Sequence, residues 1–225
     1  MEVNPRPADW RPSMTLLSGP LDVFGHCCRL VVKEKDVECT MSYVSVSEDP
    51  AIVGRHNPYG ETPVLLDRDV TLYDMRVIIE YLDERFPHPP LLPADPVARA
   101  KARLIIFRLT RDWLKPIYRL GEVKAPRLSV ELHKDLHDGL VALSPIVGGQ
   151  QFLMGGDCTL VDACFAPLLW RLPMLGVELP KQAAPLLAYG ESLFARPSFY
   201  ASMSKMEMEL RDPLPLPAVS RSKRQ

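Results

Sequence analysis

Two different spacings of apolar residues divide the chain. In the first part, short apolar or β-branched runs lie between turns rich in glycine, proline and aspartate, a pattern typical of β-strands. Helical spacing of apolar residues separates the first two runs and follows the last one. The runs predict strands at residues 14–18, 39–46, 62–67 and 69–74, and the helical spacing predicts helices over residues 23–35 and 75–86.

The order of these segments predicts how the strands pair. The first two strands are joined by a helix, which favours a parallel arrangement, whereas the last two are separated only by the turn at Asp67, Arg68 and Asp69. Such a tight turn makes a hairpin, whose strands are antiparallel. Residues 47–60 are rich in breakers and predict a short helix or loop. Residues 14–86 are therefore expected to form a thioredoxin-like α/β domain.

The second part of the chain contains helical patterns only. Asp95 followed by Pro96 is a typical helix start, and Thr159-x-x-Asp162 is a variant of the capping box. Pro116 is expected to kink or end the first of these helices, and Pro167 to bend the third, which is the most apolar one. The expected helices cover residues 96–120, 128–147, 157–176, 181–195 and 196–210.

These patterns give a domain plan. Residues 95–211 are expected to form an all-α domain, joined to the α/β domain by a linker over residues 87–94. The stretch FPHPPLLP, residues 86–93, supplies four prolines to this linker. Residues 1–13 and 212–225 are polar and rich in proline, so we expect a disordered leader and a disordered tail.

Composition removes several classes of function. The chain has 225 residues, 47% of them hydrophobic, and a formal net charge of -1, so no global field attracts nucleic acid or anionic membranes. No apolar run approaches the length of a membrane span, and the first residues lack the apolar core of a signal peptide. Five cysteines without a C-x-x-C pair are typical of reduced thiols, which indicates a cytoplasmic protein.

Two charged helical patterns have competing interpretations. His133 and His137 lie four residues apart, as in some metal sites, but no third ligand is evident, so a solvated helix face is favoured. Basic residues crowd the helix at residues 96–120, where a solvated outer face is favoured over a patch for an acidic partner. These residues are Arg99, Lys101, Arg103, Arg108 and Arg111.

The sequence resembles known proteins at two levels. The Thr62-Pro63 dipeptide before the third strand and the Thr159-x-x-Asp162 box resemble the glutathione-transferase fold. The segments LYDMRVIIEYLDERFPHPPLLPADPVARAKARL and TLVDACFAPLLWRLPMLGVELP are similar to the stringent starvation protein A family of bacteria. That resemblance implies a dimeric, cytoplasmic protein that associates with RNA polymerase holoenzyme and alters promoter use under stress. It implies no cofactor and no transferase activity.

The residues at the expected nucleophile site argue against catalysis. A glutathione transferase needs a group that favours the thiolate of glutathione. Aligned with the C-P-F start of thiol-bearing relatives, the cysteine position falls on Asp22, whose carboxylate would repel a thiolate. Ser18 remains an alternative, although a capping or turn role is commoner for serine before Gly-Pro. Cys27 and Cys28 lie further into the helix and are interpreted as core thiols.

The rest of the glutathione site is also altered. Members of the wider fold hold the proline equivalent to Pro63 in cis, which turns the backbone N–H of the residue before it, here Thr62, towards the ligand. Transferases carry an acid-serine dipeptide where this chain has Asp74 and Met75, so the hydroxyl is missing. We interpret the whole set as a degenerate glutathione site. A glutathione transferase and a glutathione-binding sensor remain the alternatives.

The proline stretch can be a spacer or a recognition surface. Proline-rich segments are stiff, so a partner that binds one loses little further conformational entropy. The residues alone leave the two interpretations nearly even. In the family that the chain resembles, the Pro-His-Pro triplet marks a surface needed for transcription. The resemblance therefore implies a docking surface for the polymerase, with the sigma subunit as the expected contact, at Pro87, His88, Pro89, Pro90 and Arg85.

Overall fold

The computed structural model describes residues 14–121 and 126–211. Its first part is a four-stranded sheet in the order β2-β1-β3-β4. The pairing of β1 with β2 is parallel and that of β3 with β4 is antiparallel, which confirms both predictions. The elements are β1 (Thr15–Ser18), α1 (Val23–Glu34), β2 (Thr40–Tyr43), α2 (Pro50–Gly54), β3 (Val64–Asp67), β4 (Val70–Tyr73) and α3 (Met75–Arg85).

The second part of the chain is helical, as expected. It comprises α4 (Pro96–Leu109), a π-helical turn (Thr110–Leu114), α5 (Lys115–Tyr118), α6 (Val130–Val147), α7 (Leu160–Arg171), a 3₁₀ turn (Lys181–Ala183), α8 (Ala184–Phe194), α9 (Pro197–Ser202) and α10 (Lys205–Met208). The expected leader and tail, residues 1–13 and 212–225, lie outside the described residues.

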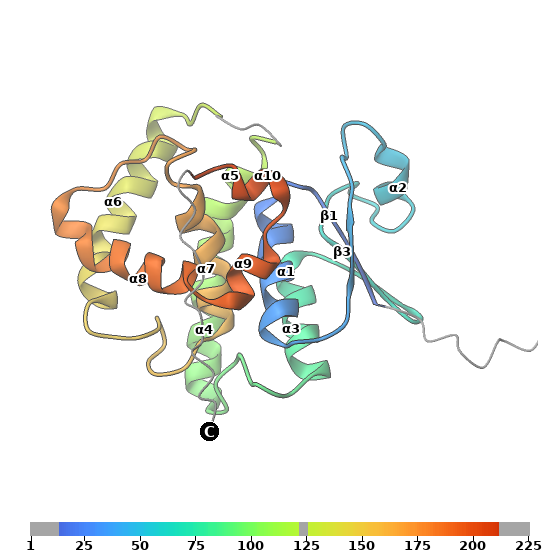
Figure 1. Cartoon of the computed structure of the whole chain (residues 1–225), viewed down its shortest axis with the longest axis horizontal. Helices are drawn as coiled ribbons and strands as arrows, with labels where there is room; N and C mark the ends of the chain where they lie inside the picture. Colours follow the sequence, from blue (N-terminus) through green and yellow to red (C-terminus); the bar gives the residue numbers. More distant parts are fainter. Residues whose placement is uncertain (1–13, 122–125, 212–225) are drawn as a thin grey trace, which may run out of the picture.

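Helices α1 and α7 form the centre of the molecule. Figure 1 shows α1 and α3 between the strands and the helical part. All twelve residues of α7 are buried, which explains why its sequence is apolar around its whole circumference. Cys27, Cys28 and Cys164 belong to the large hydrophobic core that spans both parts of the chain. The two parts therefore share one core.

Local signals fix the starts of several helices. The Asp22 carboxylate accepts the backbone N–H of Phe24 at 2.8 Å and caps α1. Thr159 and Asp162 form the expected capping box at the start of α7. Helix α6 begins after Ser129, whose side chain is its N-cap, two residues later than the apolar pattern predicts.

The long helix predicted for residues 96–120 is interrupted. It changes to a π-helical turn at Thr110, where the Lys115 N–H bonds to the Thr110 carbonyl five residues earlier. Pro116 has no N–H for the carbonyl of Asp112 one turn before it, so the chain widens ahead of the proline. The sequence identified the proline that causes the break, but placed the break too late.

The single helix predicted for residues 196–210 is wrong. Two short helices, α9 and α10, meet at Met203 and Ser204. Ser204 starts α10 with a capping box in which its side chain accepts from the Glu207 N–H and Glu207 accepts from the Ser204 N–H. The pattern Ser-x-x-Glu is a recognised start signal, so the sequence carried the information for this break.

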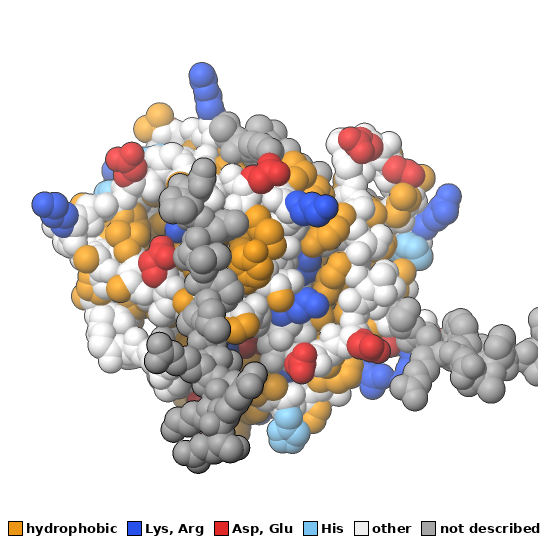
Figure 2. Space-filling model, viewed as in Figure 1, with side chains coloured by type: hydrophobic (Ala, Val, Ile, Leu, Met, Phe, Trp, Pro, Cys, Tyr) orange, Lys and Arg blue, Asp and Glu red, His pale blue; other side chains and the backbone are white. Residues whose placement is uncertain are grey.

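The surface carries mixed charges. On the face in Figure 2, lysine and arginine side chains are interspersed with aspartate and glutamate and with small hydrophobic patches. That face offers no extended basic surface of the kind that binds nucleic acid backbones. Among the described residues, no helix is both long and apolar enough to cross a membrane.

Candidate functional site

The proline stretch lies at the surface between α3 and α4. Pro87, His88, Pro89 and Pro90 are all exposed, and the peptide bond between His88 and Pro89 is cis. Arg85 precedes them at the end of α3. Its Nε donates to Asp67 Oδ2 at 2.9 Å and its guanidinium lies 5.5 Å from the ring centre of Phe86. All five residues of the expected docking surface are thus exposed, and they lie within residues 85–90, where Phe86 between them is half-buried.

A buried ion pair holds this exposed stretch in place. Lys35, 4% exposed, donates from Nζ to the Asp83 carboxylate and to the Pro89 carbonyl. Asp83 also accepts the backbone N–H groups of Leu91 at 2.8 Å and Leu92 at 3.1 Å. The path of the chain from Pro89 to Leu92 is therefore fixed from beneath. No sequence pattern singles out Lys35 or Asp83 for this task.

Ser18, the remaining candidate nucleophile, is occupied inside the protein. It is 1% exposed. Its Oγ donates to the Gly19 carbonyl at 3.1 Å and accepts from Nη1 of Arg29. A hydroxyl placed in this way points to structural partners and does not reach a ligand.

Four of the other five residues of the degenerate glutathione site line one cavity of 530 Å³. Thr62, Pro63, Asp74 and Met75 meet there, and the bond between Thr62 and Pro63 is cis. The structure thus brings these four together, whereas Ser18 is outside this lining. Asp22 lines a neighbouring cavity, which also includes Thr62.

Two polar groups of that cavity already have protein partners. The Thr62 backbone N–H donates to the Tyr118 hydroxyl at 3.2 Å, and the Tyr118 ring lies 4.9 Å from that of Phe24. Burial raises the pKa of Tyr118 to about 12, so the group is a neutral phenol at neutral pH. The Asp74 carboxylate caps α3 and accepts from both Nε and Nη2 of Arg76. A ligand would have to displace these contacts.

The cysteines beside this region are core residues. Cys27 and Cys28 are both 0% exposed, as predicted. Burial raises the pKa of Cys28 well above its ordinary value, which keeps the thiol protonated and unreactive. Neither thiol can serve as a nucleophile for an external substrate in this conformation.

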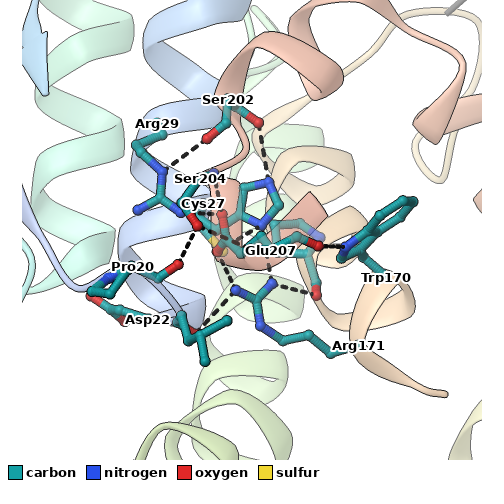
Figure 3. A network of polar contacts seen from close by, with 12 residues as sticks. Pro20, Asp22, Cys27, Arg29, Trp170, Arg171, Ser202, Ser204 and Glu207 are labelled. Atoms are coloured by element: carbon teal, nitrogen blue, oxygen red, sulfur yellow. Dashed lines mark hydrogen bonds and ion pairs between the residues drawn. The ribbon is translucent and has the colours of Figure 1, made fainter. Parts of the chain in front are cut away.

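A buried ionic network joins the last helix to the rest of the molecule (Figure 3). Glu207 of α10 is 0% exposed and forms ion pairs with Arg29 of α1 at 2.6 Å and with Arg171 of α7. Burial alone would raise the pKa of Glu207, but the charges of Arg29 and Arg171, and of His26 once acid has protonated it, lower it overall. The network therefore stabilises the ionised carboxylate at the junction of three helices.

His26 completes this network in its neutral form. Its Nδ1 lies 3.0 Å from Nη1 of Arg171, which can only donate, so Nδ1 is the acceptor. Nε2 then carries the proton and donates to Ser202 Oγ at 3.1 Å. Burial lowers the pKa of His26 to about 4. Two sequence features could have pointed to this network. They are the charged residues inside otherwise apolar helices and the Ser204-x-x-Glu207 capping box.

Acid should destabilise the protein through these two groups. His26 has a pKa of about 4 in the folded chain against 6.5 ordinarily, so the unfolded chain takes up its proton first and stability falls as pH drops from 6.5 to 4. The free energy of unfolding that is lost through His26 approaches about 3 kcal/mol once the pH is below 4. The lowered pKa of Glu207 acts in the same direction below pH 4.5. Urea unfolding across this range measures the slope. His26→Gln should reduce it, and an equal slope in both proteins would contradict the assignment.

The remaining sequence candidates have local partners. His133 Nε2 lies 3.2 Å from the Gly176 carbonyl, and His137 Nδ1 lies 2.9 Å from Asp138 Oδ1. In the described part of the chain, no three His, Cys, Asp or Glu side chains gather as metal ligands would. On α4, Arg103 pairs with Glu80 at 2.8 Å. Arg108 and Arg111, on α4 and the π-helical turn, both lie near Asp112, and Arg99 bonds to the Pro93 carbonyl.

Comparisons with known proteins find matches in both parts of the chain. Residues 23–85 match the N-terminal domain of glutathione S-transferase and residues 121–197 match its C-terminal domain. A stringent starvation protein A homolog from Coxiella burnetii is 44% identical over 90% of this chain and 97% of its own length. One from Pasteurella multocida is 39% identical over 87% and 92%. The rice glutathione transferase GST1, solved in complex with glutathione, has a TM-score of 0.75 at 24% identity, over 88% of this chain and 93% of that one.

Proposed function

The chain belongs to the stringent starvation protein A family, and from this premise we propose that it regulates transcription under starvation or stress by docking on RNA polymerase holoenzyme. It acts through protein contact, near the sigma subunit, and catalyses no reaction. The observation that carries the proposal is the exposed stretch from Arg85 to Pro90, held in one path by the buried pair of Lys35 and Asp83.

The anchored stretch has the properties of a recognition surface. Prolines present apolar surface and free carbonyls, and the imidazole of His88 adds one directional donor or acceptor. Because Lys35 fixes the Pro89 carbonyl, little conformational freedom remains to be lost on binding. These features support docking by a protein partner.

The altered ligand site supports a function without catalysis. A transferase requires a group that stabilises the thiolate of glutathione and a free backbone N–H beside it. In this chain Ser18 bonds to Gly19 and Arg29, and the Thr62 N–H bonds to Tyr118. Fold similarity to glutathione transferases does not by itself bring their activity.

Co-purification tests the proposed function. The tagged full chain, expressed in its source cells, is expected to retain core polymerase and sigma subunits after affinity purification and washing. Recovery of the tagged chain without any polymerase subunit would contradict the proposal. Chemical cross-linking of the same preparation identifies the polymerase subunit that this chain contacts.

The second candidate is a glutathione transferase or a glutathione-binding sensor. The 530 Å³ cavity beside Thr62 and Pro63 favours it, since its size suits a small molecule. We expect no turnover of a chlorinated aromatic acceptor and no heat of binding with glutathione. Clear turnover that is lost in the folded Ser18→Ala variant would replace the docking proposal by this one. Binding without turnover would support the sensor.

We expect the chain to be a homodimer in the cytoplasm. On α4, Leu104 is 58% exposed and Phe107 42%, and Val77 of the adjoining α3 is 50% exposed. Such an apolar surface is typical of an interface between subunits. Leu104→Glu with Phe107→Glu is expected to give monomers in sedimentation velocity runs, whereas Leu187→Glu, an equally exposed position on α8, leaves the dimer intact. A monomeric unaltered chain, or a dimeric double variant, would contradict this assignment.

A further inference from the structure

A cavity of 320 Å³ lies between α6 and the wall that α4 and the π-helical turn form. Its volume falls within the range of about 300–1,000 Å³ that is typical of small-molecule sites. Phe165 of α7, 2% exposed, and Leu109 of α4, 5% exposed, are its most buried lining residues. Leu104 and Phe107, which we assign to the subunit interface, are outside the lining. The cavity is therefore distinct from the surface assigned to the dimer.

Apolar and aromatic side chains make up most of this lining. Trp113 and Phe165 contribute two aromatic rings, whose centres lie 6.4 Å apart. Leu143 and Ile146 of α6, and Leu153 of the loop that follows α6, contribute aliphatic surface. Aromatic rings prefer offset or edge-to-face contacts with one another. The lining therefore suits an aromatic ligand that buries its rings.

The charged residues of the lining, Arg108 and Asp112, are of opposite sign and pair with each other. Arg108 Nε lies 4.0 Å from Asp112 Oδ2, and the two side chains are 75% and 47% exposed, so both lie towards solvent. Arg111, outside the lining, also lies 3.7 Å from Asp112. In the part of the chain that the structure describes, no polar side-chain atom of the lining is both buried and without a partner. The cavity thus offers a ligand neither a net charge nor an unsatisfied buried polar group.

Two unusual backbone features shape the wall at Trp113. The residue lies in the π-helical turn, and such turns inside helices are frequent at functional sites. On the facing helix, α6 has glycine at position 139, although glycine is unfavourable inside a helix. A Cβ added to Gly139 would lie 2.4 Å from Cζ2 of Trp113. The absence of a side chain at residue 139 therefore lets the indole ring lie directly against α6.

From this arrangement we propose that the cavity between α4 and α6 binds a small uncharged aromatic molecule, with its rings against Trp113, Leu143 and Ile146. Burial of the rings supplies the affinity. A charged group of either sign would leave water for an apolar lining whose own charges already pair with each other, and that transfer is unfavourable. The site therefore discriminates against anions and cations of the same shape. It is separate from the exposed proline stretch and does not depend on polymerase docking.

Titration of the full chain with three fused-ring aromatic probes tests the proposal. Indole is neutral, indole-2-carboxylate is an anion and N-methylquinolinium is a cation, and the three are similar in size. Methyl chemical shifts of Leu143, Ile146 and Leu153, measured by NMR, report binding in this cavity. We expect indole to bind at least about tenfold more tightly than either charged probe.

Ala142→Phe places a ring inside the cavity, because residue 142 belongs to the lining. The affinity for indole is expected to fall at least about tenfold in this variant. Ala188→Phe, at an exposed position of α8 outside the lining, is the matched control and should bind indole like the unaltered chain. Absence of indole binding at millimolar concentration, equally tight binding of a charged probe, or unchanged binding in folded Ala142→Phe would each overturn the proposal.

If Ala142→Phe does not fold, Ile146→Glu takes its place. Ile146 is 56% exposed, so the substitution spares the core, and the charge that it brings into the apolar lining should weaken indole binding. Unchanged indole binding in Ile146→Glu would also overturn the proposal. Failure of the unaltered chain to bind indole, together with monomers of Ile146→Glu in sedimentation velocity runs, would assign the cavity to the subunit interface instead.

Discussion

Replacement of Glu207 by glutamine is expected to lower the free energy of unfolding by about 3–5 kcal/mol, because it leaves buried positive charges without their counter-charge. Arg29 and Arg171 are 0% and 1% exposed, and both pair with this one carboxylate. Glutamine keeps the shape of the side chain and removes only the charge. The loss would separate α10 from α1 and α7 before the rest of the core opens.

Guanidinium unfolding followed by circular dichroism measures this change. Glu178→Gln, at an exposed position, is the matched control and is expected to change the unfolding free energy by less than about 0.5 kcal/mol. Equal stability of the Glu207 and Glu178 variants would mean that the ion pairs of Glu207 make no net contribution to the free energy of unfolding. A simultaneous loss of Arg29 and Glu207 should cost less than the sum of the two single changes, since the pair is removed together.

Replacement of Pro87, His88 and Pro89 by alanine is expected to abolish binding to RNA polymerase holoenzyme and leave the fold intact. The three side chains are exposed, so little packing is lost. The contact from Lys35 goes to a backbone carbonyl, which alanine retains at residue 89. We expect affinity to fall at least about tenfold, as for the central residues of other interfaces.

The control for this variant is Pro173→Ala, an exposed proline remote in sequence. It should bind the holoenzyme like the unaltered chain. Unfolding curves of both variants show whether a loss of binding follows from a loss of structure. Full binding by a folded triple variant would remove the proline stretch from the docking surface.

The fold was largely predictable because its signals are local. The two-residue turn after Asp67 makes the β3–β4 pairing antiparallel, and the helix between β1 and β2 makes theirs parallel. Asp22, Asp95 and Thr159 cap the helices that their sequence contexts indicate. Resemblance over almost the whole chain then identified the family, which the relatives confirm.

The contacts of the candidate site were not predictable from spacing. Glu207 and Arg29 are hydrogen-bonded although 178 residues separate them in the sequence. The separation is 56 residues for Tyr118 and the Thr62 N–H, and 54 residues for Lys35 and the Pro89 carbonyl. The first two pairs form only when the two parts of the chain pack together, and the third forms when the linker lies back against the end of α1. Composition indicated that the proline stretch would be stiff, but not that a buried ion pair would anchor it.

Docking is tested by titration of purified RNA polymerase holoenzyme with the purified full chain, followed by fluorescence anisotropy. We expect saturable binding by the unaltered chain, loss of binding in the Pro87, His88 and Pro89 alanine variant, and retention of binding in Pro173→Ala. Absence of binding by the unaltered chain, or equal binding by the triple variant, would contradict the docking proposal.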